Sequence, residues 1–448
     1  MQEAPSTAPS RGHTPPAHTF ALAVLAVLGI MAALAVGSCS LVSTGRTGPS
    51  LYERIPGAGE PTVRVRVGAG LDTLHIGSAG VARPADGGTM ITLARGGHLR
   101  LRDTGWVIED GGGGSRRVGT SGPLVVRALT PGNPLRVDEA TFVGELWAHA
   151  RETEPGTFDL VEHLSVESYL PGVLARELYS HWHPQAYRAQ AVAARSYALH
   201  EIARRRAHRS GLHYDLVSTT ANQAYTGWTD RAVAHQAVLD TLGEVLTHDG
   251  ELLRTYYSST AGGRVAGAAD SWPTTGRFAF NAAEPLQAGH RATFDDDAPR
   301  ARWTVTRNLT TFARRIAAYG TREGFSIARL ESIDRIDIAA RNAAGRPTRY
   351  TVRDRAGRSF ELAAEHMRIA GNYAASGIPR VEAKARLHSG DLAFRVTGSR
   401  LEIDGRGHGH GVGMSQFGAQ GMAIRGSNYL DILAHFYPGS ELTSWYTE

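Results

Sequence analysis

Two histidines stand one residue apart near the C-terminal end of the chain, in the glycine-rich segment GRGHGHGVGMSQFGAQGMA of residues 405–423. His408 and His410 are at positions i and i+2, so in an extended backbone both side chains point to one face, a spacing compatible with a metal. A metal site needs further ligands, and only Asp404 lies nearby in the sequence. A phosphate loop does not fit either, because the lysine and glycine spacing of a Walker motif are missing. We therefore predict no metal and no cofactor.

We interpret this segment as a wall that contacts a larger ligand. Its glycines allow a ligand to approach the backbone closely. His408, His410, Ser415 and Gln416 would then present hydrogen-bonding groups to that ligand, with other side chains packed beneath.

Residues 167–211 are rich in alanine, leucine and arginine at helical spacing. The pattern predicts a short helix that ends near Leu178 and a long helix from about Pro184 to about Arg206, with proline in its first turn. Alanines keep the long helix thin, so other backbones can approach it and we expect it to be central. Glu177 ends the short helix; taken alone, a glutamate there is usually a solvated surface charge.

Polar residues within the long helix leave alternatives open. Arg195 lies among small residues, where a charge needs a partner, so it contacts substrate, orients Glu177 or forms a structural ion pair. Gln190 and Tyr197 share one stripe about two turns apart, so each contacts a ligand or packs within the core.

The rest of the chain predicts an α+β protein in four parts. Residues 1–39 contain an apolar block followed by VGSC, typical of a signal peptide with a lipidated cysteine, Cys39, or of a signal anchor. Residues 40–62 predict a flexible tether, residues 63–120 a β-rich N-terminal segment with alternating strands, and residues 121–448 the functional core around the central helix pair. Both interpretations of the N-terminus predict export to the cell envelope.

Composition limits the partners. The 448 residues are 42% hydrophobic with a formal net charge of +5, and the positive charges are interleaved with acids. No basic run is dense enough to predict nucleic-acid binding. Cys39 is the only cysteine, which excludes disulfides within the chain.

Four motifs occur in an order that resembles the stage II sporulation protein D and amidase enhancer family. They are VLAREL with QAYRAQAVAARSYAL, then DLVSTTANQAYTGW, then YYSSTAGGRV, and finally GHGHGVGMSQFGAQGMA with YLDILAHFYPGSEL, within about residues 120–448. Some family members hold zinc with a cysteine and a histidine in the second motif, but this chain has no cysteine there.

The resemblance implies a protein that acts on peptidoglycan. Sporulation members of the family are lytic transglycosylases, which cut between N-acetylmuramic acid and N-acetylglucosamine and leave a 1,6-anhydro end. It implies Glu177 as catalytic acid, with the sugar C6 hydroxyl as nucleophile. It further implies substrate contacts at Arg195, Gln190, Tyr225 and Ser259, besides the C-terminal wall. The alternative is a non-catalytic wall-binding enhancer that stimulates a separate amidase.

Overall fold

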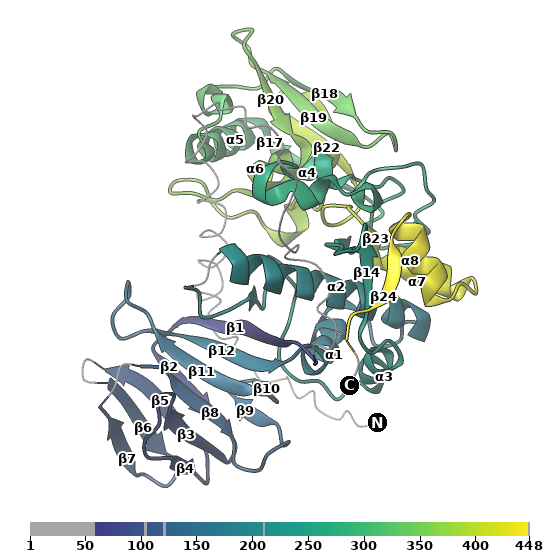
Figure 1. Cartoon of the computed structure of the whole chain (residues 1–448). Helices are drawn as coiled ribbons and strands as arrows, with labels where there is room; N and C mark the ends of the chain where they lie inside the picture. Colours follow the sequence, from purple (N-terminus) through teal and green to yellow (C-terminus); the bar gives the residue numbers. More distant parts are fainter. Residues whose placement is uncertain (1–58, 103–104, 120–121, 209–210, 447–448) are drawn as a thin grey trace, which may run out of the picture. The chain divides into compact units, whose positions relative to one another are not determined.

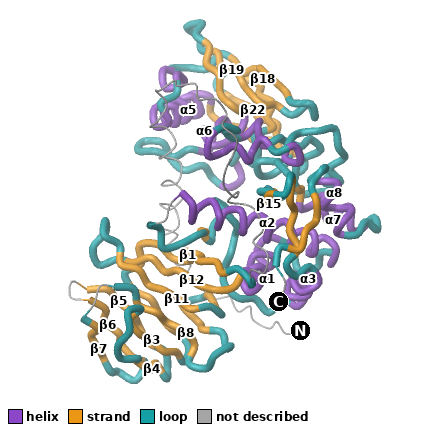
Figure 2. The backbone as a smooth tube through the Cα atoms, viewed as in Figure 1, coloured by secondary structure: helices purple, strands orange, loops and turns teal. Residues whose placement is uncertain are grey.

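The computed structural model describes residues 59–102, 105–119, 122–208 and 211–446 (Figure 1). Helices and sheets are both abundant along this part of the chain, which confirms the α+β class (Figure 2). The apolar block, Cys39 and nearly all of the predicted tether lie outside the described residues. Among the helices that the structure describes, none has the length and apolar character needed to cross a membrane.

The N-terminal part is a sandwich of two antiparallel sheets that share one hydrophobic core. The first sheet has the order β13-β1-β12-β11-β8-β3-β4, with bounds Leu216–Val217, Thr62–Leu71, Phe158–Ser165, Glu145–Ala150, Leu124–Ala128, Gly80–Pro84 and Ile91–Leu93. The second has the order β10-β9-β2-β5-β6-β7, with bounds Ala140–Phe142, Leu135–Val137, Thr73–Ile76, Gly97–Arg102, Gly105–Asp110 and Ser115–Val118. Among the described strands of these two sheets, the short β13 is the one that pairs in parallel, alongside β1.

Alternation in the sequence explains these strands, since Val63 and Val65 of β1 are fully buried while the arginines beside them lie on the opposite face. The sandwich continues beyond the boundary expected at residue 120. Strand β8 pairs with both β3 and β11, so that boundary falls inside a sheet. Pairing between strands far apart in the sequence, which no local pattern reveals, makes residues 62–165 one sandwich.

Eight α-helices lie along the described chain. They are α1 Val166–Glu177, α2 Pro184–His208, α3 Ala232–Asp240, α4 Ala268–Ser271, α5 Leu309–Glu323, α6 Ala364–Asn372, α7 Gln416–Ile424 and α8 Tyr429–Phe436. Four 3₁₀ turns accompany them, η1 Gly276–Ala282, η2 Glu284–Leu286, η3 Ser326–Arg329 and η4 Ala383–Ala385. The helix pair predicted around the Glu177 motif is confirmed, with ends within two residues of those expected.

Helix α2 is central, as its composition predicted. One side of it, including Tyr187 and Ala191, belongs to the core of the sandwich and helix α1. The other side, including Ala189 and Val192, belongs to a second core formed with α7, α8 and the strands beside them. A helix buried on both sides needs small residues, because each alanine lets a neighbouring backbone approach more closely.

Smaller sheets complete the fold. They are β15-β14-β24 (Glu251–Leu252, Glu244–His248, Glu441–Ser444), β16-β23 (Tyr257–Ser258, Met414–Ser415), β17-β22-β21 (Arg302–Asn308, Arg400–Arg406, Asp391–Thr397) and β18-β19-β20 (Arg335–Arg341, Pro347–Arg353, Ser359–Ala363). The last two sheets, with α5 and α6, enclose a third core. We call residues 302–406 the insert, because they stand between two segments that meet at the candidate site.

Candidate active site

Glu177 is the last residue of α1, where the chain leaves helical geometry at Leu178. One carboxylate oxygen, Oε1, accepts a hydrogen bond of 3.0 Å from the backbone N–H of Ala224. The other, Oε2, accepts one of 3.0 Å from Nε2 of Gln416, the first residue of α7. Three segments far apart in the sequence therefore meet at this half-buried carboxyl group.

Burial raises the pKa of the Glu177 carboxyl group above its ordinary value. The bonds from Gln416 and Ala224, and the charge of Arg176, oppose that rise in decreasing order. Among the described residues, no second carboxyl group contributes to the shift. The raised pKa favours the protonated form of Glu177, which is the form that a carboxyl group needs in order to donate a proton.

The buried side-chain amide of Gln223 holds the loop that carries Ala224 in place. Its Nε2 donates to the carbonyl of Ala194 on α2 and to the Tyr257 hydroxyl, each at 3.0 Å, and its Oε1 accepts from the Tyr169 hydroxyl at 3.3 Å. The sequence analysis missed Gln223 and Tyr169, because their partners lie on other elements. The one signal that could have found Gln223 is its position within the motif DLVSTTANQAYTGW.

Tyr225 has a different place from the one expected. It is 3% exposed, and its hydroxyl donates a 2.7 Å bond to Glu162 of β12. The other Glu162 oxygen accepts from the backbone N–H groups of Val143 and Gly144, at 3.2 and 3.0 Å. Burial raises the pKa of Glu162 to about 7 against these bonds. In this structure Tyr225 holds the loop that carries Ala224 against the β-sandwich. A substrate contact by the Tyr225 hydroxyl would require breaking its bond to Glu162.

Close packing brings this loop against α1. A side chain at Gly172 would place its Cβ 2.3 Å from the carbonyl oxygen of Gly227 and 2.5 Å from the Tyr225 ring. Glycine is therefore required there for the loop to lie near the helix that ends in Glu177.

Ser415 caps α7, which corrects its expected role as a ligand contact. It is 1% exposed, its Oγ accepts from the N–H of Gly418 at 3.1 Å and donates to Asp295 at 2.8 Å. Asp295 is itself buried and also accepts from Thr260, Thr293 and the backbone of the 261–263 loop. Through these bonds the Asp295 carboxylate connects the N-terminus of α7 to the 261–263 loop. Asp295 lies outside the four motifs from which the sequence analysis drew its candidate residues, so it was missed.

Arg195 is fully buried, which corrects the expectation that it meets substrate or Glu177. Its guanidinium forms a two-pronged ion pair with Glu167, at 2.7 and 2.8 Å, and donates to the carbonyl of Glu244 at 3.0 Å. The structural alternative left open by the sequence is the one observed. A buried charge among alanines needs such a partner, and Glu167 lies at the opposite end of α1 from Glu177.

Gln190 is also fully buried, yet neither its Oε1 nor its Nε2 has a hydrogen-bond partner among the described residues. It precedes Ala194 by four residues on α2, so the two share the face that meets Gln223. An unpaired buried amide is costly, which is a reason to expect a partner in a working complex. Its predicted substrate contact stays a prediction.

Ser259 and an aromatic cluster lie beside the Glu177 carboxyl group. The half-exposed Ser259 accepts a 3.0 Å bond at its carbonyl from the N–H of Phe417. The Phe417 ring packs edge-on against Trp182, with centroids 4.9 Å apart, and Tyr179 joins them while remaining 55% exposed. An exposed aromatic ring two residues beyond Glu177 is a surface on which a sugar can stack.

His408 and His410 do not share one face, contrary to the expectation for an extended segment. The His408 ring contacts His388, with centroids 5.2 Å apart, whereas the His410 ring lies 5.1 Å from that of Trp272. The reason is the backbone, because the intervening Gly409 has a φ of 103° and the strand alternation is broken. His408 remains half-exposed.

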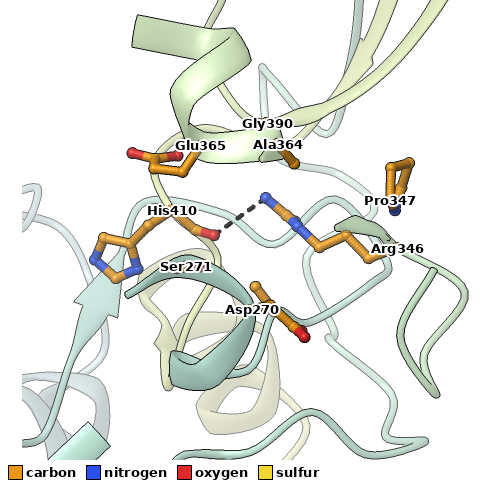
Figure 3. Close-up of a pocket in the computed structure, with 9 residues that line it drawn as sticks. Asp270, Ser271, Arg346, Pro347, Ala364, Glu365, Gly390 and His410 are labelled. Carbon is orange, nitrogen blue, oxygen red and sulfur yellow. Dashed lines mark hydrogen bonds between the residues drawn. The ribbon is translucent and has the colours of Figure 1, made fainter. Parts of the chain in front are cut away.

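His410 lines a polar pocket together with Asp270, Ser271, Arg346 and Glu365 (Figure 3). The Arg346 guanidinium donates to the carbonyl of His410 at 3.1 Å (Figure 3). It also donates to the carbonyls of Ala261 and Arg264. Burial lowers the pKa of His410 to about 4. The described residues contain no group of three or more histidine, cysteine, aspartate or glutamate side chains that could hold a metal.

Comparison with known proteins agrees with the motifs. Residues 154–248, which include α1, α2 and the Ala224 loop, match the model of the SpoIID family, described as Stage II sporulation protein. Over these residues the chain is therefore similar to the SpoIID family. The resemblance drawn from the sequence is thereby confirmed, and the matched residues include Glu177 and the loop bonded to it.

Three similar proteins each match a similar share of the chain. The amidase enhancer of Bacillus subtilis (strain 168) is 26% identical over 305 residues, which are 62% of this chain and 40% of that protein. A Brachyspira hyodysenteriae (strain ATCC 49526 / WA1) protein is 28% identical over 295 residues, 64% of this chain and 69% of its own. Stage II sporulation protein D of Bacillus amyloliquefaciens is 24% identical over 296 residues, 63% and 75% respectively. These relatives support a role related to the cell wall.

Proposed function

We propose that this protein cleaves the glycan strands of peptidoglycan as a lytic transglycosylase, with Glu177 as the single acid and base. The observation that carries the proposal is the Glu177 carboxyl group, held by Ala224 and Gln416 and raised in pKa by burial. Among the described residues, no second carboxyl group shifts that pKa. A one-carboxyl site fits a reaction in which the substrate supplies its own nucleophile, rather than a two-carboxylate hydrolysis.

The reaction balances without water. Protonated Glu177 donates its proton to the oxygen between N-acetylmuramic acid and N-acetylglucosamine, and the C1–O bond breaks with its electron pair on the leaving sugar. The C6 hydroxyl oxygen of the muramic residue then bonds to C1, and the Glu177 carboxylate takes the hydroxyl proton. The products are a 1,6-anhydro end and a free N-acetylglucosamine 4-hydroxyl, and Glu177 is protonated again.

The surroundings of Glu177 supply the remaining requirements. Gln416 and the Ala224 N–H hold the carboxyl group in one orientation while it changes charge. Tyr179 offers an exposed ring beside it, and Ser259 and His408 continue a polar surface away from it. Such a combination of stacking and hydrogen bonding suits an extended glycan strand.

We also propose that the chain is exported and held at the membrane through its N-terminus. The apolar block and Cys39 in the sequence support this, by lipidation or by a signal anchor. An envelope location would bring the chain to its polymer.

The second candidate is a non-catalytic enhancer that binds the wall and stimulates a separate amidase. The similarity to the Bacillus subtilis amidase enhancer favours it, although this chain spans only 40% of that protein. The two candidates differ in whether the activity of the protein requires the Glu177 carboxyl group.

Digestion of purified sacculi by the full-length protein, followed by mass spectrometry of released fragments, tests the proposal. We expect 1,6-anhydro-muramic ends from the wild type. We expect Glu177→Gln to bind sacculi and to lose about a hundred- to ten-thousand-fold in rate, since it keeps the shape but lacks the transferable proton. Reducing ends would indicate a hydrolase instead. No cleavage by either form, with equal stimulation of an added amidase, would establish the enhancer.

A further inference from the structure

A basic patch lies on the surface that leads away from Glu177. We define it as His388, His408, Arg300 and Arg386, with Trp303 at its edge. The rings of His388 and His408 are 5.2 Å apart, and the Trp303 ring lies 5.1 Å from His388. Trp303 is fixed by a 2.9 Å bond from its Nε1 to the carbonyl of Gly407. Arg300 precedes Ala301, whose carbonyl accepts a 3.1 Å bond from the N–H of Gly407, and Arg386 lies two residues before His388. The patch therefore combines a positioned aromatic ring with cationic side chains.

One side-chain hydrogen bond and three backbone hydrogen bonds connect the Glu177 carboxyl group to this patch. Gln416 contacts Glu177, the next residue Phe417 donates to Ser259, and the following Thr260 exchanges two backbone bonds with His408, at 2.9 and 3.2 Å. Summed over these steps, the path from the Glu177 carboxyl group to His408 is no longer than about 20 Å. A glycan strand that lies at Glu177 reaches the patch within a few sugars.

The positive charge of the patch is not neutralised within the described residues. Arg300 and Arg386 are exposed and form no ion pair there. Burial, followed by the charges of Arg300, Arg368 and Arg386, lowers the pKa of His408 to about 4, and no acid opposes this. Arg368 has its own partner, Glu365. The two exposed arginines therefore lack an anion.

We propose that the basic patch binds a carboxylate carried by the glycan strand, at a distance from the bond that Glu177 cleaves. This inference rests on the proposed function and specifies the substrate further. Arg300 and Arg386 supply the charge, His408 supplies a neutral ring nitrogen, and the Trp303 ring contacts a sugar face. An uncharged polymer of N-acetylglucosamine alone lacks the group that these residues recognise. Two carboxylates are available on peptidoglycan: that of the muramic lactyl group when no peptide is attached, and those of the stem peptide.

The test measures binding by the full-length chain in detergent, with Glu177→Gln throughout so that no strand is cut. The probes are labelled peptidoglycan strands without stem peptides, strands that keep them, and an N-acetylglucosamine oligomer of equal length without carboxylates. The test variant is Arg300→Gln with Arg386→Gln. The matched control is Arg335→Gln with Arg349→Gln, which removes two exposed arginines from β18 and β19 of the same insert.

We expect the test variant to lose about five- to thirtyfold in affinity for one of the two carboxylate-bearing probes and to keep its affinity for the oligomer. The probe affected identifies the lactyl or the peptide carboxylate. The parent is the chain that carries Glu177→Gln alone. The control should bind all three probes with the same affinity as the parent, and the parent's preference for the affected probe should weaken as the salt concentration rises.

Equal binding of all three probes by the parent, or an equal loss on all three in the test variant, would overturn the inference while leaving glycan cleavage open. A loss equal to that of the control pair would overturn it too, because net charge alone would then explain the effect. If wild type shows the carboxylate preference but never cleaves a strand, the patch stands and the transglycosylase proposal fails.

Discussion

Removing the amide of Gln416 should raise the pKa of Glu177 by about one unit. Nε2 of Gln416 donates a 3.0 Å hydrogen bond to Oε2 of Glu177, and this bond is the largest of the effects that oppose the rise caused by burial. Gln416→Leu keeps a side chain of similar size at a position that is 6% exposed, and removes the donor. The charged form of Glu177 then loses more stabilisation than the protonated form.

The magnitude follows from the two kinds of hydrogen bond. A bond to a charged acceptor contributes about 1.5–3 kcal/mol and a bond to a neutral one about 0.5–1.5 kcal/mol. The difference, about 1–1.5 kcal/mol, corresponds to about one pKa unit. Because the first step needs protonated Glu177, the wild-type rate falls as the pH rises through this pKa. In the variant that fall should begin about one unit higher.

The pKa is measured by carbon NMR on protein labelled at the glutamate side-chain carboxyl carbon, with Glu177→Gln used to assign the signal. This measurement works whether or not the chain is an enzyme, and a pH–rate profile on peptidoglycan complements it. The control is Gln420→Leu on the same helix, because the Gln420 amide oxygen accepts from the N–H of His183 rather than contacting Glu177. An unchanged or lowered pKa in Gln416→Leu, or an equal rise in the control, would refute the reasoning.

Further outcomes follow from other parts of the molecule. Arg195→Ala should lower the free energy of unfolding by about 3–5 kcal/mol, measured by denaturant titration, because it leaves the paired carboxylate buried alone; a small loss would mean that water replaces the arginine. Burial lowers the pKa of both His149 and His163 to about 4, so the unfolded chain binds more protons between about pH 6.5 and 4. As the pH falls from about 6.5 to 4, the free energy of unfolding should therefore decrease by up to about 1 kcal/mol per histidine, after allowance for solvent screening. Replacing both histidines with glutamine should make this decrease smaller. Cys39→Ser should abolish palmitate labelling and detergent partitioning; membrane retention of an unprocessed chain would indicate a helical anchor. EDTA should leave activity unchanged, since the described residues offer no set of three ligands, and a loss restored by zinc would contradict this.

The sequence alone was sufficient where the physical cause is local. Alternation predicted the strands that begin at residue 62, and proline at the first turn placed the start of α2 correctly at Pro184. The motif around Glu177 identified that residue before its contacts were known, because the residues that define the family lie within single helices and loops.

The sequence was insufficient where a side chain's partner lies far along the chain. Whether Arg195 met substrate or an acid depended on the position of Glu167, 28 residues away. The direction of the His408 and His410 rings depended on the backbone angles of Gly409 between them, and i, i+2 spacing indicates a common face only in a regular strand. For Ser415 and Tyr225, the deciding partners were buried carboxylates, Asp295 and Glu162, on other elements. Residue type and spacing thus determined which groups are available for chemistry, whereas the three-dimensional packing decided which of them reach Glu177, because desolvation and hydrogen bonding depend on neighbours in space.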